Sequence, residues 1–180
     1  MMKVLHMSRT FFMKTDRVGF SKWKEADTDL ASCLWGNAEV TRFICASGMF
    51  TEDEIMTRLE TELNNNELFH MQYWPVFHLG DDEFIGCCGL RPHDEDSLEL
   101  GFHLLPAYWH QGYAYEAAKA VMEYAFGNYD IEKLTAGHHP ENKASEHVLK
   151  RLGFICTGTE YYPPTGLMHP IYQYLKEGQK

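Results

Sequence analysis

The sequence lacks the long apolar segments of membrane and secreted proteins. No window approaches the run of about 20 apolar residues that spans a bilayer, and residues 1–14 hold no apolar stretch long enough for a signal peptide. Internal repeats, low-complexity tracts and linker-like segments are absent as well. The chain is therefore expected to form a single cytoplasmic domain over residues 1–180, with 1–14 as an N-terminal extension and no membrane partner.

Cysteine and histidine lack the spacings that mark a disulfide framework or a metal site. The five cysteines are odd in number and show no CxxC pair, and the ten histidines show no HExxH or three-ligand spacing. Reduced thiols and ordinary strand or loop histidines, including the adjacent His138 and His139, are the expected interpretation. The sequence predicts no bound metal.

Basic residues are also in short supply, because 16 Lys and Arg stand against 26 Asp and Glu, for a net charge of −10. This balance argues against a nucleic-acid partner, whose phosphates need a basic surface. It is compatible with an amine substrate, although an acidic surface that only keeps the protein soluble has the same composition. Composition leaves the oligomeric state open between monomer and homodimer.

The chain does contain an alternation of strand-like and helix-like periodicities. Strands are expected over residues 17–23, 73–79, 84–91, 98–105, 134–137, 154–161 and 169–175. Helices are expected from Asp27 or Thr28 to Gly36, from Thr51 to Asn64–Asn66, across Ala114–Ala125, and from Asn142 to Leu152. This order predicts an α/β fold in which helices flank a mixed sheet.

Local signals refine three of these elements. Thr51 and Glu54 form a capping box that starts the second helix. Pro75 favours an edge or an early position in its strand, because proline cannot donate to the ladder. The strand over 98–105 is almost wholly apolar and is expected at the centre of the sheet.

The segment from Glu99 to Ala117 is the most informative part of the chain. An apolar strand stops at Pro106, a short loop containing Gly112 follows, and a helix starts at once. Backbone N–H groups at a helix N-terminus suit a pyrophosphate, and a glycine lets an anion approach closely. Taken alone, the loop is also typical of an ordinary strand–helix turn, and the fuller P-loop and Rossmann fingerprints are absent.

A second segment, from His138 to Phe154, carries another candidate site. Asn142 suits the N-cap of a helix, and Ser145 lies one turn further on. Either these two residues belong to a capped helix that faces the sheet, or they point into the same cleft as the Gly112 loop.

Together these segments resemble the GNAT superfamily of acetyltransferases, and within it the branch that contains the ribosomal-protein alanine N-acetyltransferases. Four blocks agree in order, from about Thr15 to the C-terminus. The blocks are Thr15-Asp-Arg17 followed by Trp23 and Asp27, Ile85-Gly-Cys-Cys-Gly-Leu90, Glu99-Leu-Gly-Phe102 through Trp109-His-Gln-Gly-Tyr-Ala-Tyr-Glu-Ala117, and Asn142-Lys-Ala-Ser145 through Leu152-Gly-Phe154.

The resemblance implies a GNAT-like fold, with a mixed, mostly antiparallel and splayed central sheet flanked by helices. It implies that the cosubstrate acetyl-CoA lies in the gap between the strand at Glu99–Leu105 and the strand at Leu134–Gly137. The cofactor-binding residues that it implies are Phe102, His103 and Leu104 for the pantetheine, His110, Gln111, Gly112, Tyr113, Ala114 and Tyr115 for the pyrophosphate, and Asn142 and Ser145 beside them.

The sequence departs from the family pattern at two positions. His110 stands where glycine is common, which adds a side chain to the pyrophosphate loop. Leu149 stands where many members carry a tyrosine that protonates the departing thiolate. The resemblance then makes Ser145, with Asn142 beside it, the catalytic candidate for discharging the thiolate.

The implied activity is direct transfer of an acetyl group to a primary amine, the α-amino group of a protein or peptide N-terminus or of an amino acid. Glu99 is the leading candidate for the general base, against the alternative of a structural strand carboxylate, and Glu160 is a second candidate. Two other functions stay open: acetylation of a small-molecule amine such as a polyamine or an antibiotic, and a non-catalytic acyl-CoA sensor. Residues 35–68 are expected to decide the acceptor.

Overall fold

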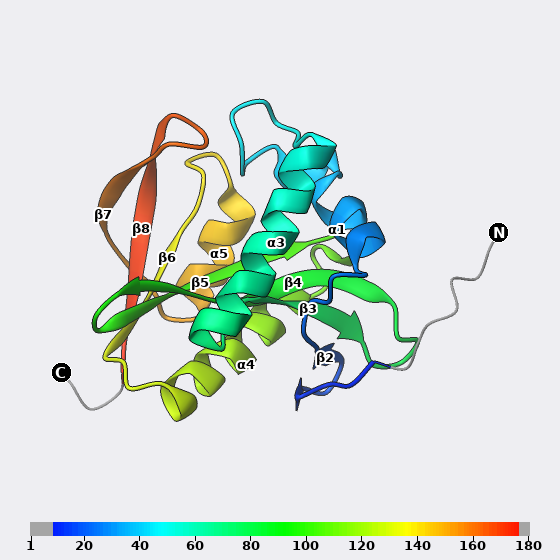
Figure 1. Ribbon diagram of the computed structural model, residues 1–180. Helices are drawn as coiled ribbons and strands as arrows, with labels where there is room; N and C mark the ends of the chain where they lie inside the picture. The colour runs from blue at the N-terminus through cyan, green and yellow to red at the C-terminus, as the bar shows by residue number, and fades with distance from the viewer. Residues whose placement is uncertain (1–8, 177–180) are drawn as a thin grey trace.

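The computed structural model describes residues 9–176, and its strands form one sheet in the order β1-β2-β3-β4-β5-β6-β8-β7 (Figure 1). The strands are β1 Met13–Lys14, β2 Val18–Phe20, β3 Tyr73–His78, β4 Phe84–Asp94, β5 Ser97–Leu104, β6 Lys133–Gly137, β7 Ile155–Tyr162 and β8 Leu167–Leu175. The helices are α1 Thr28–Trp35, α2 Ala38–Thr41, α3 Glu52–Phe69, α4 Tyr113–Asn128 and α5 Lys143–Arg151, with a short 3₁₀ turn at Pro106–Tyr108. Within residues 9–176, no helix is both long enough and apolar enough to cross a membrane.

The sheet is mixed and mostly antiparallel, as the sequence predicts. Only β5 and β6 run parallel, and β5 occupies the central position expected for its apolar sequence. These two strands pair over three residues, from Ser97 opposite Lys133 to Glu99 opposite Thr135. Beyond Glu99, β5 continues to Leu104 and β6 to Gly137 without pairing to each other, so the sheet is splayed at its centre.

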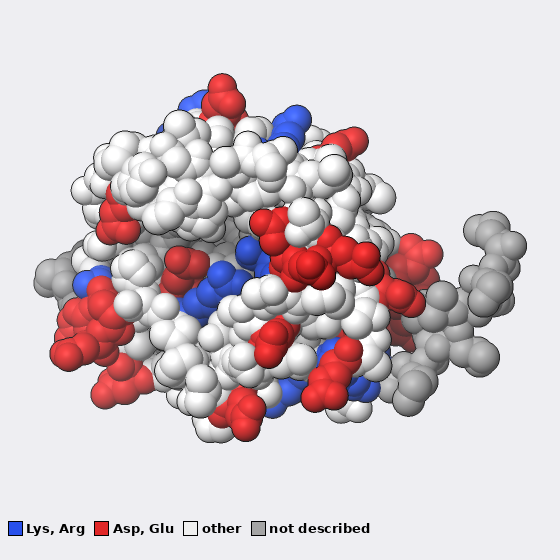
Figure 2. Space-filling view, turned by 45° about the horizontal axis from the view of Figure 1, so that its top comes forward, with Lys and Arg blue, Asp and Glu red and all other residues white. Residues whose placement is uncertain are grey.

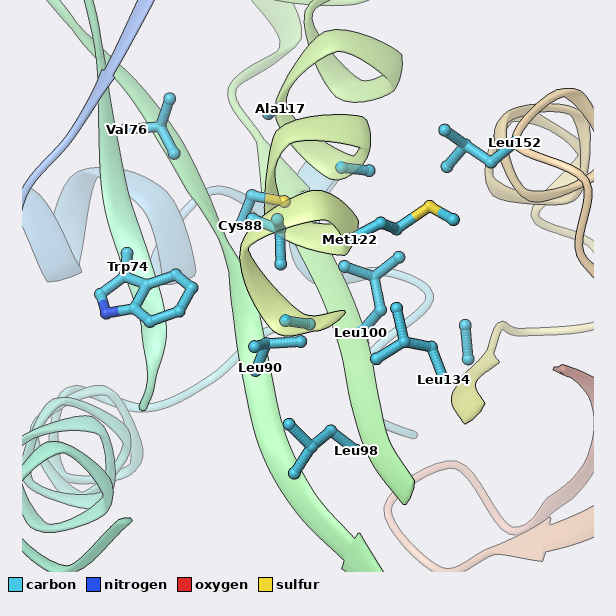
Figure 3. Close-up of a cluster of buried hydrophobic side chains, with 14 of the residues drawn as sticks. Trp74, Val76, Cys88, Leu90, Leu98, Leu100, Ala117, Met122, Leu134 and Leu152 are labelled. Carbon is cyan, nitrogen blue, oxygen red and sulfur yellow. The ribbon is translucent and has the colours of Figure 1, made fainter. Parts of the chain in front are cut away.

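Helices cover both faces of the sheet, α4 on one face and α1 with α3 on the other (Figure 1). The small residues of α4 lie directly on the strands, where Ala117, Ala118 and Ala125 are almost completely buried. Figure 3 shows the core on this side, with Met122 of α4 above Leu100 of β5. The predicted apolar face of this helix is therefore confirmed.

The two adjacent cysteines of β4 illustrate how one strand serves two cores. Cys88 belongs to the cluster under α4, and Cys87 belongs to the cluster under α1 and α3. Successive side chains of a strand point to opposite faces, so the apolar run in β4 is buried on both sides. The odd-numbered residues of β5 face the α1–α3 side, because His103 and Glu99 contact Trp35 of α1 and Tyr73 of β3.

Two expectations, for the end of α3 and for Pro75 in β3, need correction. Helix α3 starts with the predicted Thr51–Glu54 capping box but continues through Asn64–Asn66 to Phe69, because asparagine is only a mild helix breaker. It ends where His70 adopts a left-handed φ of 58°. Of the two alternatives for Pro75, the edge strand is wrong, since β3 is an inner strand, whereas the early position agrees with the structure, since Pro75 is the third residue of β3. The Pro75 carbonyl accepts a hydrogen bond from the Ser21 N–H at 3.0 Å, just past the end of β2 at Phe20, so the missing N–H of Pro75 falls at the end of the β2–β3 ladder.

The N-terminal segment differs from the predicted extension in its described part. Residues 9–14 include the short strand β1, which pairs with β2, whereas residues 1–8 lie outside the described part of the chain. The strand expected over 17–23 is confined to Val18–Phe20. The one-turn helix α2 follows α1 after the predicted stop at Gly36 and Asn37.

Candidate functional site

A cleft of about 790 Å³ opens where β5 and β6 separate. Its walls are the C-terminal half of β5, the end of β6, the loop before α4, helix α5 and residues of α2 and α3. Figure 2 shows a hollowed face of the molecule in which basic and acidic side chains lie close together. The two segments that the sequence analysis singled out, around Gly112 and around Asn142, both line this cleft.

The loop before α4 presents an open helix N-terminus to the cleft. Gly112 is the N-cap residue, with a left-handed φ of 84°, and no side chain caps the helix. The first N–H groups of an α-helix have no partner within the helix, so the amides of Tyr113, Ala114 and Tyr115 are available to an anion. His110 also has a left-handed φ, of 59°, which explains why glycine suits that position.

An ion pair between Arg17 and Glu116 supports this loop. The Arg17 guanidinium donates to Glu116 Oε2 at 2.6 Å and to the backbone oxygen of Gln111 at 3.0 Å, and it lies 4.2 Å from the centre of the Tyr113 ring. Thr15 Oγ1 donates to Glu116 Oε1 at 2.6 Å. Burial acts to raise the pKa of Glu116, but the hydrogen bonds from Thr15 and Arg17 outweigh it and lower that pKa. Thr15 and Arg17, from the first of the four blocks that resemble the family, thus support the loop at Gly112, which belongs to the third block.

The edge of β5 that faces the cleft is free. Phe102, His103 and Leu104 pair with β4 on one side only, because β6 has separated from β5 by that point. Their backbone groups can therefore pair with an extended ligand. The side chain of His103 accepts a hydrogen bond at Nδ1 from Trp35 Nε1, at 3.3 Å. Burial, together with the charges of Arg58 and Arg91, lowers the pKa of His103 well below its usual value, so the imidazole is neutral.

Glu99 is half-buried on the cleft floor, and Tyr73 holds it in place. The Tyr73 hydroxyl donates to Glu99 Oε1. To reach it, the Tyr73 ring crosses directly over Gly101, where a Cβ would lie 2.2 Å from Cζ of the ring. Burial and the charge of Glu99 raise the pKa of Tyr73 well above its usual value, which keeps the phenol protonated as a donor.

A buried ion pair lies beside Glu99. Glu62 of α3 has no exposed surface, and it accepts hydrogen bonds from Arg91 Nη2 and from the Tyr73 backbone N–H, the latter at 2.7 Å. The Arg91 guanidinium stacks 4.1 Å from the centre of the Tyr73 ring. Arg58, also on α3, lines the same part of the cleft. The sequence predicts that residues 35–68 decide the acceptor, but no local pattern singles out Arg58 or Glu62 within them, and the quoted block of β4 stops at Leu90, one residue before Arg91.

Helix α5 supplies the opposite wall. Asn142 is its N-cap, and Asn142 Oδ1 accepts a hydrogen bond from the Ser145 N–H at 3.1 Å. Both residues also line the cleft, so the two alternatives left by the sequence are combined rather than exclusive. Leu149, one turn after Ser145, is buried in the core. Glu160 of β7 is exposed at the rim of the cleft.

His138, which directly follows β6, lines the cleft, whereas the sequence predicts only an ordinary strand or loop histidine at this position. Its Nδ1 donates to the backbone oxygen of His139 at 2.8 Å, so Nε2 carries no proton in the neutral ring. Nε2 is buried without a hydrogen-bond partner, and burial lowers the pKa of His138. Its position after a buried strand was the available signal, since strand ends border the sites of open sheets.

Comparisons with known proteins match most of the chain to one family. A family model described as an acetyltransferase (GNAT) domain matches residues 17–155. An uncharacterized N-acetyltransferase, p20 of Bacillus licheniformis, is 26% identical over 165 residues, which cover 89% of this chain and 92% of the relative.

Two solved structures share the fold. A ribosomal L7/L12 alpha-N-protein acetyltransferase in complex with coenzyme A has a TM-score of 0.78 at 14% identity, covering 94% of this chain and 100% of the other. A ribosomal-protein-S5-alanine acetyltransferase from Vibrio fischeri has a TM-score of 0.73 at 17% identity, covering 93% and 98% of the two chains.

Proposed function

The chain belongs to the GNAT family of acetyltransferases, and from that premise we propose that it transfers the acetyl group of acetyl-CoA to the α-amino group of a peptide N-terminus or of an amino acid. The observation that carries this proposal is the coincidence of two features in one cleft. An unpaired β5 edge and an uncapped helix N-terminus lie at the opening between β5 and β6. An extended chain that ends in a pyrophosphate is complementary to both.

The residues present suit acetyl-CoA, which supplies an acetyl group activated as a thioester. The amides of Tyr113, Ala114 and Tyr115 would hold the pyrophosphate, and the free edge at Phe102–Leu104 would hold the pantetheine. A β5 N–H near Phe102 or His103 would donate to the acetyl carbonyl oxygen, as an oxyanion-hole donor does. The positive charge that a pyrophosphate needs is available without a P-loop lysine, because the helix N-terminus contributes it.

Glu99 would bind the amine and accept its proton. Its Oε1 accepts the Tyr73 hydroxyl, so the carboxylate is oriented and Oε2 remains for the acceptor. An α-amine has a pKa of about 8, so a modest base is sufficient near neutral pH. Glu160 is exposed at the rim, whereas Glu99 lies on the strand that would hold the thioester, and this favours Glu99 as the base.

Ser145 would discharge the thiolate. Leu149 is buried and apolar, so it offers no proton at the position where a tyrosine is expected. The Ser145 N–H is committed to Asn142 Oδ1, which fixes the residue at the cleft and leaves its hydroxyl as the group able to reach the sulfur. A thiol pKa of about 8.5 makes the thiolate a fair leaving group, so a hydrogen bond that relays a proton is enough.

The α-amino acceptor is the finer part of this proposal. It is supported by the names of two structural neighbours, which describe acetyltransferases of ribosomal proteins. Both share less than 20% identity with this chain, so they support the fold and suggest the acceptor class as a hypothesis to be measured.

Ser145→Ala tests the mechanism. We expect kcat to fall by about 10²–10⁴, the range for losing general-acid help, with the KM for acetyl-CoA nearly unchanged. The assay is thiol release from acetyl-CoA with one accepted amine, and mass spectrometry of the product locates the acetyl group. Ser32→Ala, at an exposed serine in α1, is the control and should match wild type.

A kcat for Ser145→Ala within about threefold of wild type, far below the general-acid range, would remove Ser145 from the mechanism. Tight binding of acetyl-CoA without thiol release on any amine would instead contradict the proposed activity and favour a non-catalytic acyl-CoA sensor. Acetyl transfer only to hydroxyl groups would contradict the choice of an amine.

A further inference from the structure

The acceptor side of the cleft carries an arginine without a partner. Arg91 is paired with the buried Glu62, but Arg58 forms no ion pair among residues 9–176. The Nε of Arg58 is buried and has no hydrogen-bond partner. Most buried polar groups of folded proteins are satisfied, so each exception calls for an explanation.

Aromatic rings hold the Arg58 side chain in position. Its guanidinium carbon lies 5.2 Å from the centre of a Trp35 ring and 5.5 Å from the centre of the Phe50 ring. These contacts restrict the side chain and remove part of its water. The terminal nitrogens of a guanidinium held in this way, on a residue that lines the cleft, suit a planar carboxylate.

Arg58 belongs to the acceptor end of the cleft rather than to the pyrophosphate end. It lies close enough to His103 and Cys87 for its charge to affect both groups. His103 is on the part of β5 that faces the site of acetyl transfer, whereas the loop at 110–115 lies beyond the end of that strand. A cosubstrate phosphate on the loop is therefore served by other groups.

On α3, β4 and β5, ion pairing leaves two groups of opposite charge at this end of the cleft without a charged partner among residues 9–176. Glu62 and Arg91 neutralise each other, whereas the Glu99 carboxylate accepts a hydrogen bond from the uncharged hydroxyl of Tyr73 and keeps its charge. This leaves Glu99 as a negative group and Arg58 as a positive group among the inner residues of the wall, while Glu39 and Arg42 line the cleft from exposed positions in and after α2. A polyamine would meet the uncompensated charge of Arg58, whereas a molecule with both an amine and a carboxylate would complement both groups.

We propose that the acceptor is an amine that also carries a carboxylate, with the amine at Glu99 and the carboxylate on Arg58. This inference rests on the proposed acetyltransferase function and names its substrate class. The carboxylate has two sources with the same chemistry, the α-carboxylate of a free amino acid or the acidic side chain of a peptide N-terminal residue. Arg58 is then a specificity-determining residue, and it takes no part in the proton transfers.

The test compares matched acceptors that differ only in the anionic group. One arm uses free amino acids against their carboxamides, and the other uses peptides that begin with aspartate or glutamate against peptides that begin with asparagine or glutamine. Wild-type enzyme should prefer the carboxylate member of one arm by about tenfold to a hundredfold in kcat/KM, the value of one charge-assisted hydrogen-bond pair. The arm that shows the preference identifies the source.

Arg58→Gln should abolish this preference while the KM for acetyl-CoA stays within about twofold, because the pyrophosphate loop is untouched. Lys24→Gln is the matched control, since it removes the same charge from an exposed position before α1 and should leave the preference intact. Arg58→Lys should retain a reduced preference, because it keeps the charge without the fork. This variant also preserves the test if Arg58→Gln does not fold.

Equal kcat/KM values for acid and amide in both arms would overturn the inference, and so would a preference that persists in Arg58→Gln. A raised KM for acetyl-CoA with an unchanged preference would show that Arg58 contacts the cosubstrate instead. These outcomes leave the proposed activity standing. Absence of acetyl transfer to every acceptor would overturn the proposed function itself, together with this inference.

Discussion

Gly101 lies under the ring of Tyr73, and a single methyl group at this position tests the arrangement that holds Glu99. In Gly101→Ala, the new Cβ would lie 2.2 Å from Cζ and 2.3 Å from Oη of Tyr73, whereas ordinary contact begins at 3.4 Å. The ring has to shift by about 1 Å. The ring is rigid and buried and contacts Arg91 and Glu99, so it cannot move without losing these contacts.

The cost follows from two contributions. Overpacking a well-filled core by one methyl group costs about 1–3 kcal/mol. Moving the hydroxyl away from Glu99 loses a hydrogen bond to a charged group, which is worth about 1.5–3 kcal/mol. Because the ring relieves the clash by giving up the hydrogen bond, the two costs overlap, and we expect a loss of about 2–4 kcal/mol in the free energy of unfolding.

The assay is thermal unfolding followed by circular dichroism, with urea unfolding for the free energy. At about 2–4 °C per kcal/mol for a chain of this length, the Tm of Gly101→Ala should fall by roughly 5–15 °C. Gly127→Ala is the matched control, since a Cβ there meets nothing within 4 Å and the residue lies in α4. Alanine is the better helix former, so this control should be more stable by up to about 1 kcal/mol.

A double-mutant cycle with Tyr73→Ala decides whether the ring is the cause. Once the ring is removed, the Cβ at Gly101 has room, and the cost of Gly101→Ala should fall to within about 0.5 kcal/mol of zero, the limit expected for uncoupled sites. A cost that is as large in the Tyr73→Ala background as in wild type would refute the clash with Tyr73 and the positioning of Glu99 derived from it.

Two further predictions concern the loop before α4. The lowered pKa of Glu116 means that its carboxylate stabilises the fold above its usual pKa of 4.5, and that this contribution is lost as the pH falls through the lowered value. Urea unfolding should therefore show Glu116→Gln as less stable than wild type at neutral pH, and this difference in the free energy of unfolding should shrink as the pH falls below 4.5. A difference that does not depend on pH would contradict the role of the charge. At His110, whose φ is 59°, valine should be less stable than glycine by about 1–2 kcal/mol, the cost of a branched residue in a left-handed conformation. Equal thermal stability of His110→Val and His110→Gly would show that the loop relaxes without strain.

The local signals of this sequence were sufficient for the types of the longer elements and for several of their starts, whereas the short elements β1 and α2 were not predicted. The Thr51–Glu54 capping box, the start of α5 at Asn142 and the small-residue face of α4 all appear as predicted. These features depend on hydrogen bonds and periodicities within a few residues, so they can be predicted from the sequence alone. The end of α3 at His70 was not visible, because the asparagines before it permit a helix as well as a stop.

The candidate site divides in the same way. Gly112 and Ser145 were found because each sits at a helix N-terminus with a recognisable local pattern, and the structure places both on one cleft. The contact of Arg17 with Glu116 joins residues 99 positions apart, and no local pattern links them. Arg17 and Glu116 belong to two different blocks of the family resemblance, and nothing in the sequence indicates that these two blocks are in contact.

The acceptor side of the cleft was decided by tertiary structure alone. The sequence by itself determined the order of the longer elements, the central strand and the strand–loop–helix turn at Gly112, because each depends on adjacent residues. Only the packing of α3 across the sheet brings Arg58 and Glu62 to the strands that carry Tyr73 and Glu99. The charge of a site is the sum over side chains that meet in space, so a chain with a net charge of −10 can still place in its cleft an arginine, Arg58, that forms no ion pair among residues 9–176.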